Sequence, residues 1–331
     1  MLMNLFEVKH LNISFLTERG EVKAVRDISF EIRENECIAL VGESGCGKSV
    51  TARALIGLTE ITGGLVSDES EIIFQNENIL KYNKKQWDAY RGNKAAMIFQ
   101  DSMTALNPTM RIGKQIAECY RFHGKISRKE AMLHAEQMLE LVGIPNPREA
   151  AKRYPHEFSG GMRQRVMIAS ALALNPQLLI ADEPTTALDV TIQAQILELI
   201  KDLKKSSSVM LITHDLGVVA GLAERVVVMY AGKIMETGTT EEIFYQGRHP
   251  YTIGLKNASP RLDQDKKERL SSINGVPPKL IEPEPGCPFA KRCEYAMKQC
   301  REKMPEMKEL SGTHYVWCHK LMEETYGTGI N

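Results

Sequence analysis

The sequence Gly-Glu-Ser-Gly-Cys-Gly-Lys-Ser at residues 42–49 constrains the fold more than any other stretch of the chain. It follows the apolar run 37–41, which is typical of a buried strand, and precedes the helix-prone run 50–56. A glycine-rich turn between strand and helix points backbone N–H groups and the positive end of the helix dipole into one hollow, where Lys48 adds a full charge. Lys48 would reach the outer phosphates of a bound polyphosphate, and the Ser49 hydroxyl would bind the bridging Mg²⁺. We therefore predict a polyphosphate site at this turn.

Length and charge narrow the class of protein. At 331 residues the chain exceeds the usual size of one domain, which favours a large α/β domain with an appendage. The 42 basic and 42 acidic residues balance, so net charge gives no attraction to nucleic acid. No apolar run is long enough to cross a bilayer, and the start of the chain lacks the pattern of a signal peptide. We expect a soluble, cytoplasmic protein.

Strands and helices alternate along most of the chain. Loosely alternating apolar residues predict antiparallel strands over 6–15 and 22–32, ahead of the phosphate-binding strand. Helical spacing of apolar residues over 112–142 predicts a mostly helical insertion that continues to about residue 154. The further elements that we expect are strands over 71–74, 95–99, 178–181, 209–212 and 225–230 and helices over 84–90, 190–203, 216–223 and 240–245. Short apolar strands between helices indicate a mainly parallel sheet covered on both faces.

Polar residues follow two of these strands, at the edge of a parallel sheet where phosphate chemistry takes place. Asp182 and Glu183 come directly after the run 178–181. Asp182 could hold Mg²⁺ and Glu183 could orient or deprotonate an attacking water, although a loop carboxylate can instead cap the next helix. His214 follows another strand, and from its position alone it is as readily a packed or helix-start residue as a phosphate contact.

A second glycine-containing helix start lies at Ser159-Gly160-Gly161, ahead of the helical run 166–174. Exposed N–H groups and a positive helix dipole would again favour an anion. Taken alone, this could be an ordinary serine-capped helix. Because one nucleotide site needs only one such cradle, we expect the second to serve a nucleotide bound to another subunit.

Six motifs, in order, resemble those of ABC transporter ATPase subunits: residues 42–49, Gln100, residues 159–161, residues 182–183, residues 187–189 and His214. The resemblance implies an α/β P-loop NTPase of the ABC ATPase type. Its parts would be a RecA-like parallel sheet core, an antiparallel β subdomain, a helical subdomain and a cysteine-rich C-terminal extension. Each ATP would lie between the phosphate loop of one subunit and the signature 159–161 of the other, which accounts for the second cradle.

The resemblance also implies roles for single residues. Gln100 would contact Mg²⁺ and sense the membrane partner, and Glu183 would be the catalytic base. Asp189 would link the two ATP sites, and His214 would contact the terminal phosphate. Phe15 is expected to stack on adenine, with a core or edge-strand phenylalanine as the alternative. The remaining implied ATP contacts are Gly42, Ser44, Gly45, Cys46, Gly47, Lys48, Ser49, Val50, Ser159, Gly160, Gly161 and Asp182, and the implied Mg²⁺ ligands are Ser49, Gln100 and Asp182.

Two residues differ from the usual family pattern. Cys46 stands at a position that tolerates small residues, and a redox-active thiol there is the less favoured alternative. Met162 replaces the glutamine of many family members. Because the signature's donors are Ser159 and the backbone of its two glycines, we expect no loss of activity from this change.

Residues 100–108, 154–158 and 248–252 resemble the dipeptide/oligopeptide importer branch, and the chain is most similar to the first of that branch's two ATPases. The resemblance implies a heterodimer with a homologous ATPase, bound to two transmembrane permease subunits on the cytoplasmic face of the membrane. An extracytoplasmic peptide-binding protein would deliver cargo. We expect a nucleotide-binding domain over 1–255, with a helical subdomain at about 101–170, and an extension over 256–331. Another cargo, such as nickel, is the alternative; a soluble ABC protein of translation or repair is disfavoured by the single cassette and neutral charge.

Four cysteines follow a proline-rich arm over 271–286; they are Cys287, Cys293, Cys300 and Cys318. In a reducing cytosol such a group favours a metal over disulfides. No two are spaced by two to four residues, as structural zinc usually requires, and four thiolates on irregular loops can surround a [4Fe–4S] cluster. The resemblance implies this cluster, with Zn²⁺, reduced thiols or disulfides as the alternatives. Because the arm is too small to fold by burial alone, we expect a structural role, and a redox-sensing role is less favoured. His314 and His319 are expected at the surface, and replacement of a cysteine ligand by one of them is the less favoured alternative.

Overall fold

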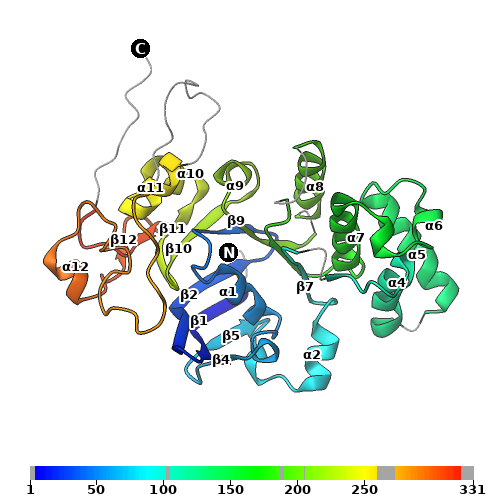
Figure 1. Cartoon of the computed structure of the whole chain (residues 1–331), viewed down its shortest axis with the longest axis horizontal. Helices are drawn as coiled ribbons and strands as arrows, with labels where there is room; N and C mark the ends of the chain where they lie inside the picture. The colour runs from blue at the N-terminus through cyan, green and yellow to red at the C-terminus, as the bar shows by residue number, and fades with distance from the viewer. Residues whose placement is uncertain are drawn as a thin grey trace, which may run out of the picture. The chain divides into compact units, whose positions relative to one another are not determined.

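A computed structural model describes residues 4–101, 105–124, 126–185, 190–204, 206–258 and 273–321 (Figure 1). The chain forms two compact units, each assembled from separate stretches of sequence. The first contains residues 33–36 and 81–211, and the second contains residues 4–32, 37–80 and the chain from 212 onward. The phosphate loop therefore belongs to the second unit, and the predicted signature and catalytic carboxylate belong to the first.

The second unit begins with an antiparallel sheet. Its strands are β1 (Asn4–Thr17), β2 (Gly20–Arg33), β4 (Gly64–Val66), β5 (Glu71–Phe74) and β6 (Glu77–Asn78). They follow the order β2-β1-β5-β6, and β4 also pairs with β1. Along β1 the buried positions change from Phe6 and Val8 to Leu11 and Ile13, because His10 between them has a left-handed φ of 48°. Phe15 comes two residues after Ile13 and therefore lies on the same face of the strand.

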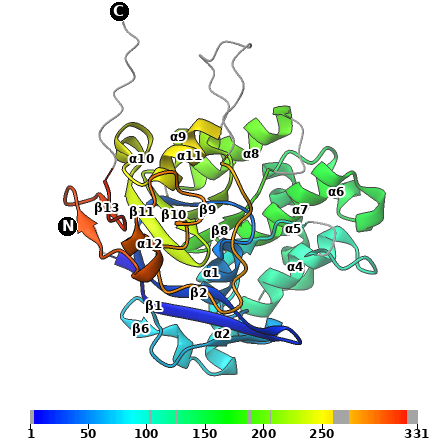
Figure 2. The same cartoon turned by 60° about the vertical axis from the view of Figure 1, so that its left-hand side comes forward.

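Five strands of a second sheet also belong to this unit. Their order is β12 (Lys308–Glu309), β13 (Tyr315–Val316), β11 (Lys233–Thr239), β10 (Arg225–Tyr230) and β3 (Cys37–Val41). β10 and β3 are parallel, whereas β11, β13 and β12 add to the sheet as antiparallel neighbours. Figure 2 shows β13 beside β11. All five residues of β3 are buried, as expected for a continuous apolar run.

The helices of the second unit surround these strands. They are α1 (Lys48–Leu55), α9 (Leu216–Leu222), α10 (Thr240–Gln246), α11 (Pro250–Ala258) and α12 (Lys298–Glu302), with short 3-10 turns η1 (Glu60–Thr62) and η2 (Ile79–Lys81). Thr239 and Glu242 form a reciprocal capping box at the start of α10, which fixes where that helix begins.

The first unit contains the strands β9 (Ser208–Thr213), β8 (Leu178–Asp182) and β7 (Ala95–Ile98), in this order, and the last two residues of β9 pass into the second unit. β8 and β7 are parallel, with Ala95 opposite Leu178. Parallel strands place their carboxyl ends at one edge, so the residues that follow β7 and β8 are neighbours.

Helices form the rest of the first unit. They are α2 (Lys84–Tyr90), α4 (Ile112–His123), α5 (Arg128–Leu141), α6 (Pro147–Ala150), α7 (Gly160–Leu172) and α8 (Val190–Leu203), with the 3-10 turn η3 (Pro155–Glu157). Figure 1 draws α4, α5 and α6 together beside α7. Arg165 of α7 is buried and donates to the carbonyl oxygens of Val142 and Gly143, both at 2.9 Å, and so satisfies the open end of α5.

The predicted elements are confirmed, with differences of one or two residues at most ends. The early antiparallel strands run longer than expected, because β1 extends to Asn4 and Thr17. The helical insertion is resolved into α4, α5 and α6. Among the helices described, none is long and apolar enough to cross a membrane.

Candidate functional site

The phosphate loop 42–49 joins β3 to α1. Gly42 has φ of 152° and Gly47 has φ of 105°, a backbone region that side chains disfavour. A Cβ at Gly42 would collide with the carbonyl oxygen of Met229, and one at Gly47 would lie 2.5 Å from that of Ala24. Glycine is therefore required at both positions by conformation and by space. Ser44 and Gly45 are exposed at the tip of the loop, and Ser49 and Val50 are half-buried in the first turn of α1.

Lys48 lies folded against this loop. Its Nζ donates to the carbonyl oxygens of Gly42 at 2.7 Å and Glu43 at 2.9 Å, and the residue is only 6% exposed. Phosphate oxygens would offer the ammonium group acceptors of higher charge than these carbonyls. The Lys48 ammonium group therefore lies beside the hollow in which a phosphate would be bound, with carbonyl oxygens as its acceptors.

Cys46 is a buried residue of the loop itself, and its Sγ lies 3.7 Å from Lys48 Nζ. Burial raises the pKa of this thiol above its usual value, against the smaller opposite effect of Lys48. A protonated, buried thiol is a poor nucleophile, so this environment favours a packing role over a redox-active one.

Two residues from the C-terminal half of the chain form hydrogen bonds with Glu43 of the loop. Tyr251 Oη accepts a hydrogen bond from Glu43 N at 2.9 Å. The guanidinium of Arg292 makes a two-pronged contact with the Glu43 carboxylate, at 2.6 and 3.0 Å. The sequence singled out residues 248–252 only as a mark of one branch, and it gave no signal for Arg292 beyond its place between two cysteines.

In the first unit, Gln100 and Glu183 come together. Gln100 follows β7, Glu183 follows β8, and Gln100 Nε2 donates to Glu183 Oε2 at 2.9 Å. Asp182 ends β8 and is buried, with 3% of its surface exposed. Glu183 has a left-handed φ of 48°, a strained conformation of the kind that collects at functional sites. The predicted catalytic base thus lies on a fixed, strained turn at the carboxyl edge.

The signature residues form the start of α7. Ser159 is the N-cap, and its Oγ accepts a hydrogen bond from Met162 N at 3.3 Å. Ser159 and Gly160 are exposed, and a Cβ at Gly160 would meet nothing within 4 Å. Locally this is a serine-capped helix, as the simpler interpretation expected. Its exposed N-terminus also has room for a phosphate held by another subunit.

The other predicted contacts are placed individually. His214 is exposed directly after β9, beside Asp215, which caps α9 by accepting from Gly217 N at 2.8 Å. Phe15 is half-buried and its ring covers Gly64 of β4, where a Cβ would lie 3.0 Å from ring carbons. Asp189 lies outside the described residues.

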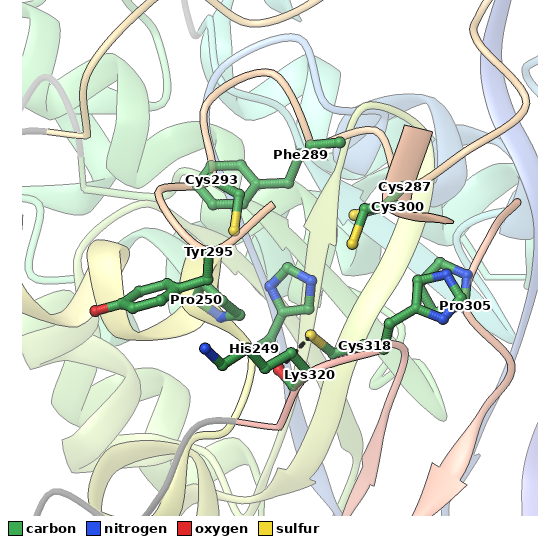
Figure 3. A pocket seen from close by; sticks show the side chains of 12 residues that line it. His249, Pro250, Cys287, Phe289, Cys293, Tyr295, Cys300, Pro305, Cys318 and Lys320 are labelled. Atoms are coloured by element: carbon green, nitrogen blue, oxygen red, sulfur yellow. Dashed lines mark hydrogen bonds between the residues drawn. The ribbon is translucent and has the colours of Figure 1, made fainter. Parts of the chain in front are cut away.

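The four C-terminal cysteines line one cavity of about 20 Å³ in the second unit. Figure 3 shows their side chains around it, together with His249 and Tyr295. All four are free thiols, and Cys318 Sγ donates to Lys320 O at 2.8 Å. Burial raises the pKa of Cys287 to about 12 and that of Cys318 to about 11. These two thiols are therefore protonated at neutral pH in this arrangement.

The donor set suits an iron–sulfur cluster or zinc in kind, because both take four thiolates. The distances between the side chains do not support either group. In the described part of the chain no three His, Cys, Asp or Glu side chains lie close enough together to hold a metal ion. Binding would require the sulfur atoms to approach one another and to lose their protons.

The prediction that His314 is at the surface is wrong. His314 is 2% exposed, and its Nε2 lies 2.8 Å from Oε1 of the fully buried Glu236. The same carboxylate accepts from the backbone N–H groups of Arg248 at 2.7 Å and His249 at 3.0 Å. Burial lowers the pKa of His249 to about 4, so this ring is neutral and its Nδ1 accepts from Tyr251 N. Glu236 thus fixes the start of α11, which carries Tyr251. His319 is partly exposed and lines the cysteine cavity.

Comparisons with known proteins match both halves of the chain. A family model described as ABC transporter matches residues 25–186, and one described as oligopeptide/dipeptide transporter, C-terminal region, matches residues 235–300. The oligopeptide transport ATP-binding protein OppD of Bacillus subtilis (strain 168) is 55% identical over 314 residues, which cover 94% of this chain and 87% of OppD. The dipeptide transport ATP-binding protein DppD of the same organism is 52% identical over 313 residues, covering 94% of this chain and 93% of DppD.

A solved structure supports the fold. The ATP-binding cassette MJ0796, in a dimeric post-hydrolysis state bound to ADP and Pi, is similar with a TM-score of 0.64 and 26% sequence identity. The similarity covers 71% of this chain and 98% of that chain.

Proposed function

The chain belongs to the family of ABC transporter ATP-binding subunits, as the order of its motifs predicted, and on this premise we propose that it powers the import of dipeptides or oligopeptides. As a member of this family it is an ATPase with the ABC ATPase fold. The main support for a peptide cargo is the second matched region, 235–300, because its family model is described as belonging to oligopeptide/dipeptide transporters. The two relatives named for oligopeptide and dipeptide transport, each matching more than nine-tenths of this chain, support the same cargo.

The proposed chemistry begins at the phosphate loop. Backbone N–H groups of residues 42–49 and the start of α1 bind the phosphates, and Lys48 exchanges its two carbonyl acceptors for phosphate oxygens. Ser49, Gln100 and Asp182 are the residues proposed to hold Mg²⁺, which would supply positive charge to the outer phosphates. Glu183 orients the attacking water and accepts its proton, and Gln100 holds the Glu183 carboxylate in place.

ATP hydrolysis in this proposal needs a second subunit. The exposed signature at Ser159 and Gly160 offers the N-terminus of α7 to an ATP on a homologous ATPase, which offers its own signature in return. His214 and Asp189 would complete the two sites, and Phe15 would stack on adenine. The pair would dock on two permease subunits at the cytoplasmic face of the membrane, supplied by an extracytoplasmic peptide-binding protein.

We also propose that the four C-terminal cysteines hold a [4Fe–4S] cluster, with Zn²⁺ as the alternative. The support is that all four cysteines line one cavity and offer a thiol-only donor set, and binding would draw their sulfur atoms closer together. A bound cluster would crosslink the extension, in which few residues are available to form a hydrophobic core. We propose separately that residues 1–255 form the nucleotide-binding domain and residues 256–331 form the C-terminal extension.

The function is tested by reconstituting the chain with its homologous ATPase and the two permeases in proteoliposomes. A peptide-loaded binding protein should stimulate ATP hydrolysis and peptide uptake together. Stimulation by nickel with its own binding protein, and none by peptides, would replace the peptide cargo. ATPase activity without any coupling to a membrane subunit would contradict the importer role.

A further inference from the structure

The turn 287–293 of the C-terminal extension reaches the phosphate loop. Its backbone closes on itself through hydrogen bonds from Ala290 N to Cys287 O at 3.0 Å and from Arg292 N to Phe289 O at 2.9 Å. Phe289 from this turn packs against Tyr230 and Tyr251, with ring centroids 5.3 and 5.2 Å apart. The turn is therefore anchored in the core of the second unit, on the same tyrosines that lie beside the phosphate loop.

Arg292 leaves this turn with every guanidinium N–H engaged. Nε donates to Asn274 O, and the two terminal nitrogens donate to Ile273 O and Tyr230 Oη, at 2.8, 3.0 and 3.1 Å respectively. The remaining two N–H groups hold the Glu43 carboxylate, and the Arg292 side chain is only 6% exposed. A buried, two-pronged guanidinium–carboxylate pair is both strong and directional.

Glu43 is the second residue of the phosphate loop and has contacts at its side chain, its N–H and its carbonyl. Its side chain binds Arg292 and its N–H binds Tyr251. Its carbonyl accepts from Lys48 Nζ at 2.9 Å and from Cys46 N, inside the loop, at 3.3 Å. When Lys48 turns to a phosphate, the first two contacts are the ones that still tie residue 43 to groups outside the loop. A loop that is already fixed loses less freedom when it binds its ligand, and so binds it more tightly.

We propose that Arg292 is a positioning residue for ATP binding: it holds the phosphate loop through Glu43 and makes ATP affinity depend on the C-terminal extension. This rests on the proposed function only in that the chain binds ATP. In this proposal Arg292 acts through Glu43 and not on the nucleotide directly, and no part of the proposal depends on a metal at the cysteines.

The test measures binding of a fluorescent ATP analogue, with Mg²⁺, to the full-length chain. Arg292→Ala should raise Kd about tenfold, as expected for loss of one charge-assisted anchor. Glu43→Gln removes the same ion pair from the other end and leaves the other Arg292 contacts available, so it serves if Arg292→Ala fails to fold. Arg292→Lys keeps the charge without the planar fork and should give an intermediate Kd.

The matched control is Lys291→Ala. Lys291 is the neighbouring residue, but its side chain is 68% exposed and pairs with Glu284 of the arm. This variant should bind the analogue as the wild type does, because exposed ion pairs contribute little. In the assembled transporter, Arg292→Ala should raise KM for ATP while kcat at saturation changes less than about twofold, the pattern of a pure binding defect.

A double-mutant cycle separates positioning from general damage to the fold. The Arg292→Ala change should have no further effect on Kd in a Glu43→Ala background. Additive losses, or wild-type Kd in folded Arg292→Ala and Glu43→Gln variants, would overturn the inference and leave the proposed function intact. Failure of the wild-type chain to bind the analogue at all would instead contradict the proposed function.

Discussion

The side-chain amide of Gln100 donates a hydrogen bond to the Glu183 carboxylate across two neighbouring strands, with 2.9 Å between Nε2 and Oε2. The two residues follow β7 and β8, which are parallel and paired, so the sheet brings their side chains to the same edge. The contact orients the Glu183 carboxylate, and the residue that makes it, Gln100, is the one proposed to sense the membrane partner. It offers a physical route by which a movement at Gln100 would change the position of the catalytic base.

Glu183→Gln should abolish turnover and spare ATP binding. Glutamine keeps a side-chain oxygen that can accept the Gln100 hydrogen bond, but it cannot take a proton from water. In the assembled pair we expect phosphate release to fall by roughly 100-fold or more, the usual size of a general-base contribution. Glu140→Gln, on the exposed end of α5, is the matched control and should hydrolyse ATP normally. Undiminished hydrolysis by Glu183→Gln would remove Glu183 from its role.

Cys46 should resist alkylation in the folded protein. Burial raises its pKa, so the thiolate fraction at pH 8 is lower than for an exposed cysteine and grows only at higher pH. Peptide mapping after brief iodoacetamide treatment should find Cys46 unmodified in native protein and modified in urea. Equal labelling rates in the two conditions would restore the redox-active alternative.

The cysteine cavity can be tested by colour and metal content. If the proposed cluster is present, anaerobically purified protein should be brown, with broad absorption near about 400 nm, and should contain iron and acid-labile sulfide. Cys300→Ser should reduce both. Colourless anaerobic protein with stoichiometric zinc would decide for the alternative, and metal-free protein would leave four free thiols.

Glu236→Ala should destabilise the second unit by about 3 kcal/mol or more, because it leaves the buried donors of His249 and His314 without their acceptor. The measurement is the free energy of unfolding in urea. Glu241→Ala, at an exposed position in the first turn of α10, should change it by less than about 0.5 kcal/mol. Equal losses in the two variants would show that the Glu236 network adds nothing specific.

Local sequence signals predicted the parts of this structure that local chemistry determines. The helix 84–90 was predicted with both its ends, and the structure shows an Asn83–Gln86 capping box at its start. The phosphate loop was predicted because its residue types, spacing and flanking elements all lie within one short stretch.

Contacts between distant residues were not accessible in this way. Arg292 and Glu43 are 249 positions apart, and Tyr251 and Glu43 are 208 apart, so no periodicity links them. His314 was misplaced because histidine is only intermediate in its tendency to be buried, and its partner Glu236 lies 78 positions away. These pairs depend on how the C-terminal part of the chain folds onto the earlier strands and loops of the second unit.

The short strand β13 has a consequence for shortened versions of this chain. It pairs with β11 through Glu236 and Thr237, so it occupies the hydrogen-bonding edge of a buried, otherwise well-formed strand. Removing residues after the arm would bare that edge and offer it to other molecules for intermolecular pairing. A protein shortened to its nucleotide-binding motifs should therefore aggregate in solution. Its low soluble yield would then reflect the exposed strand edge and not a defect in catalysis.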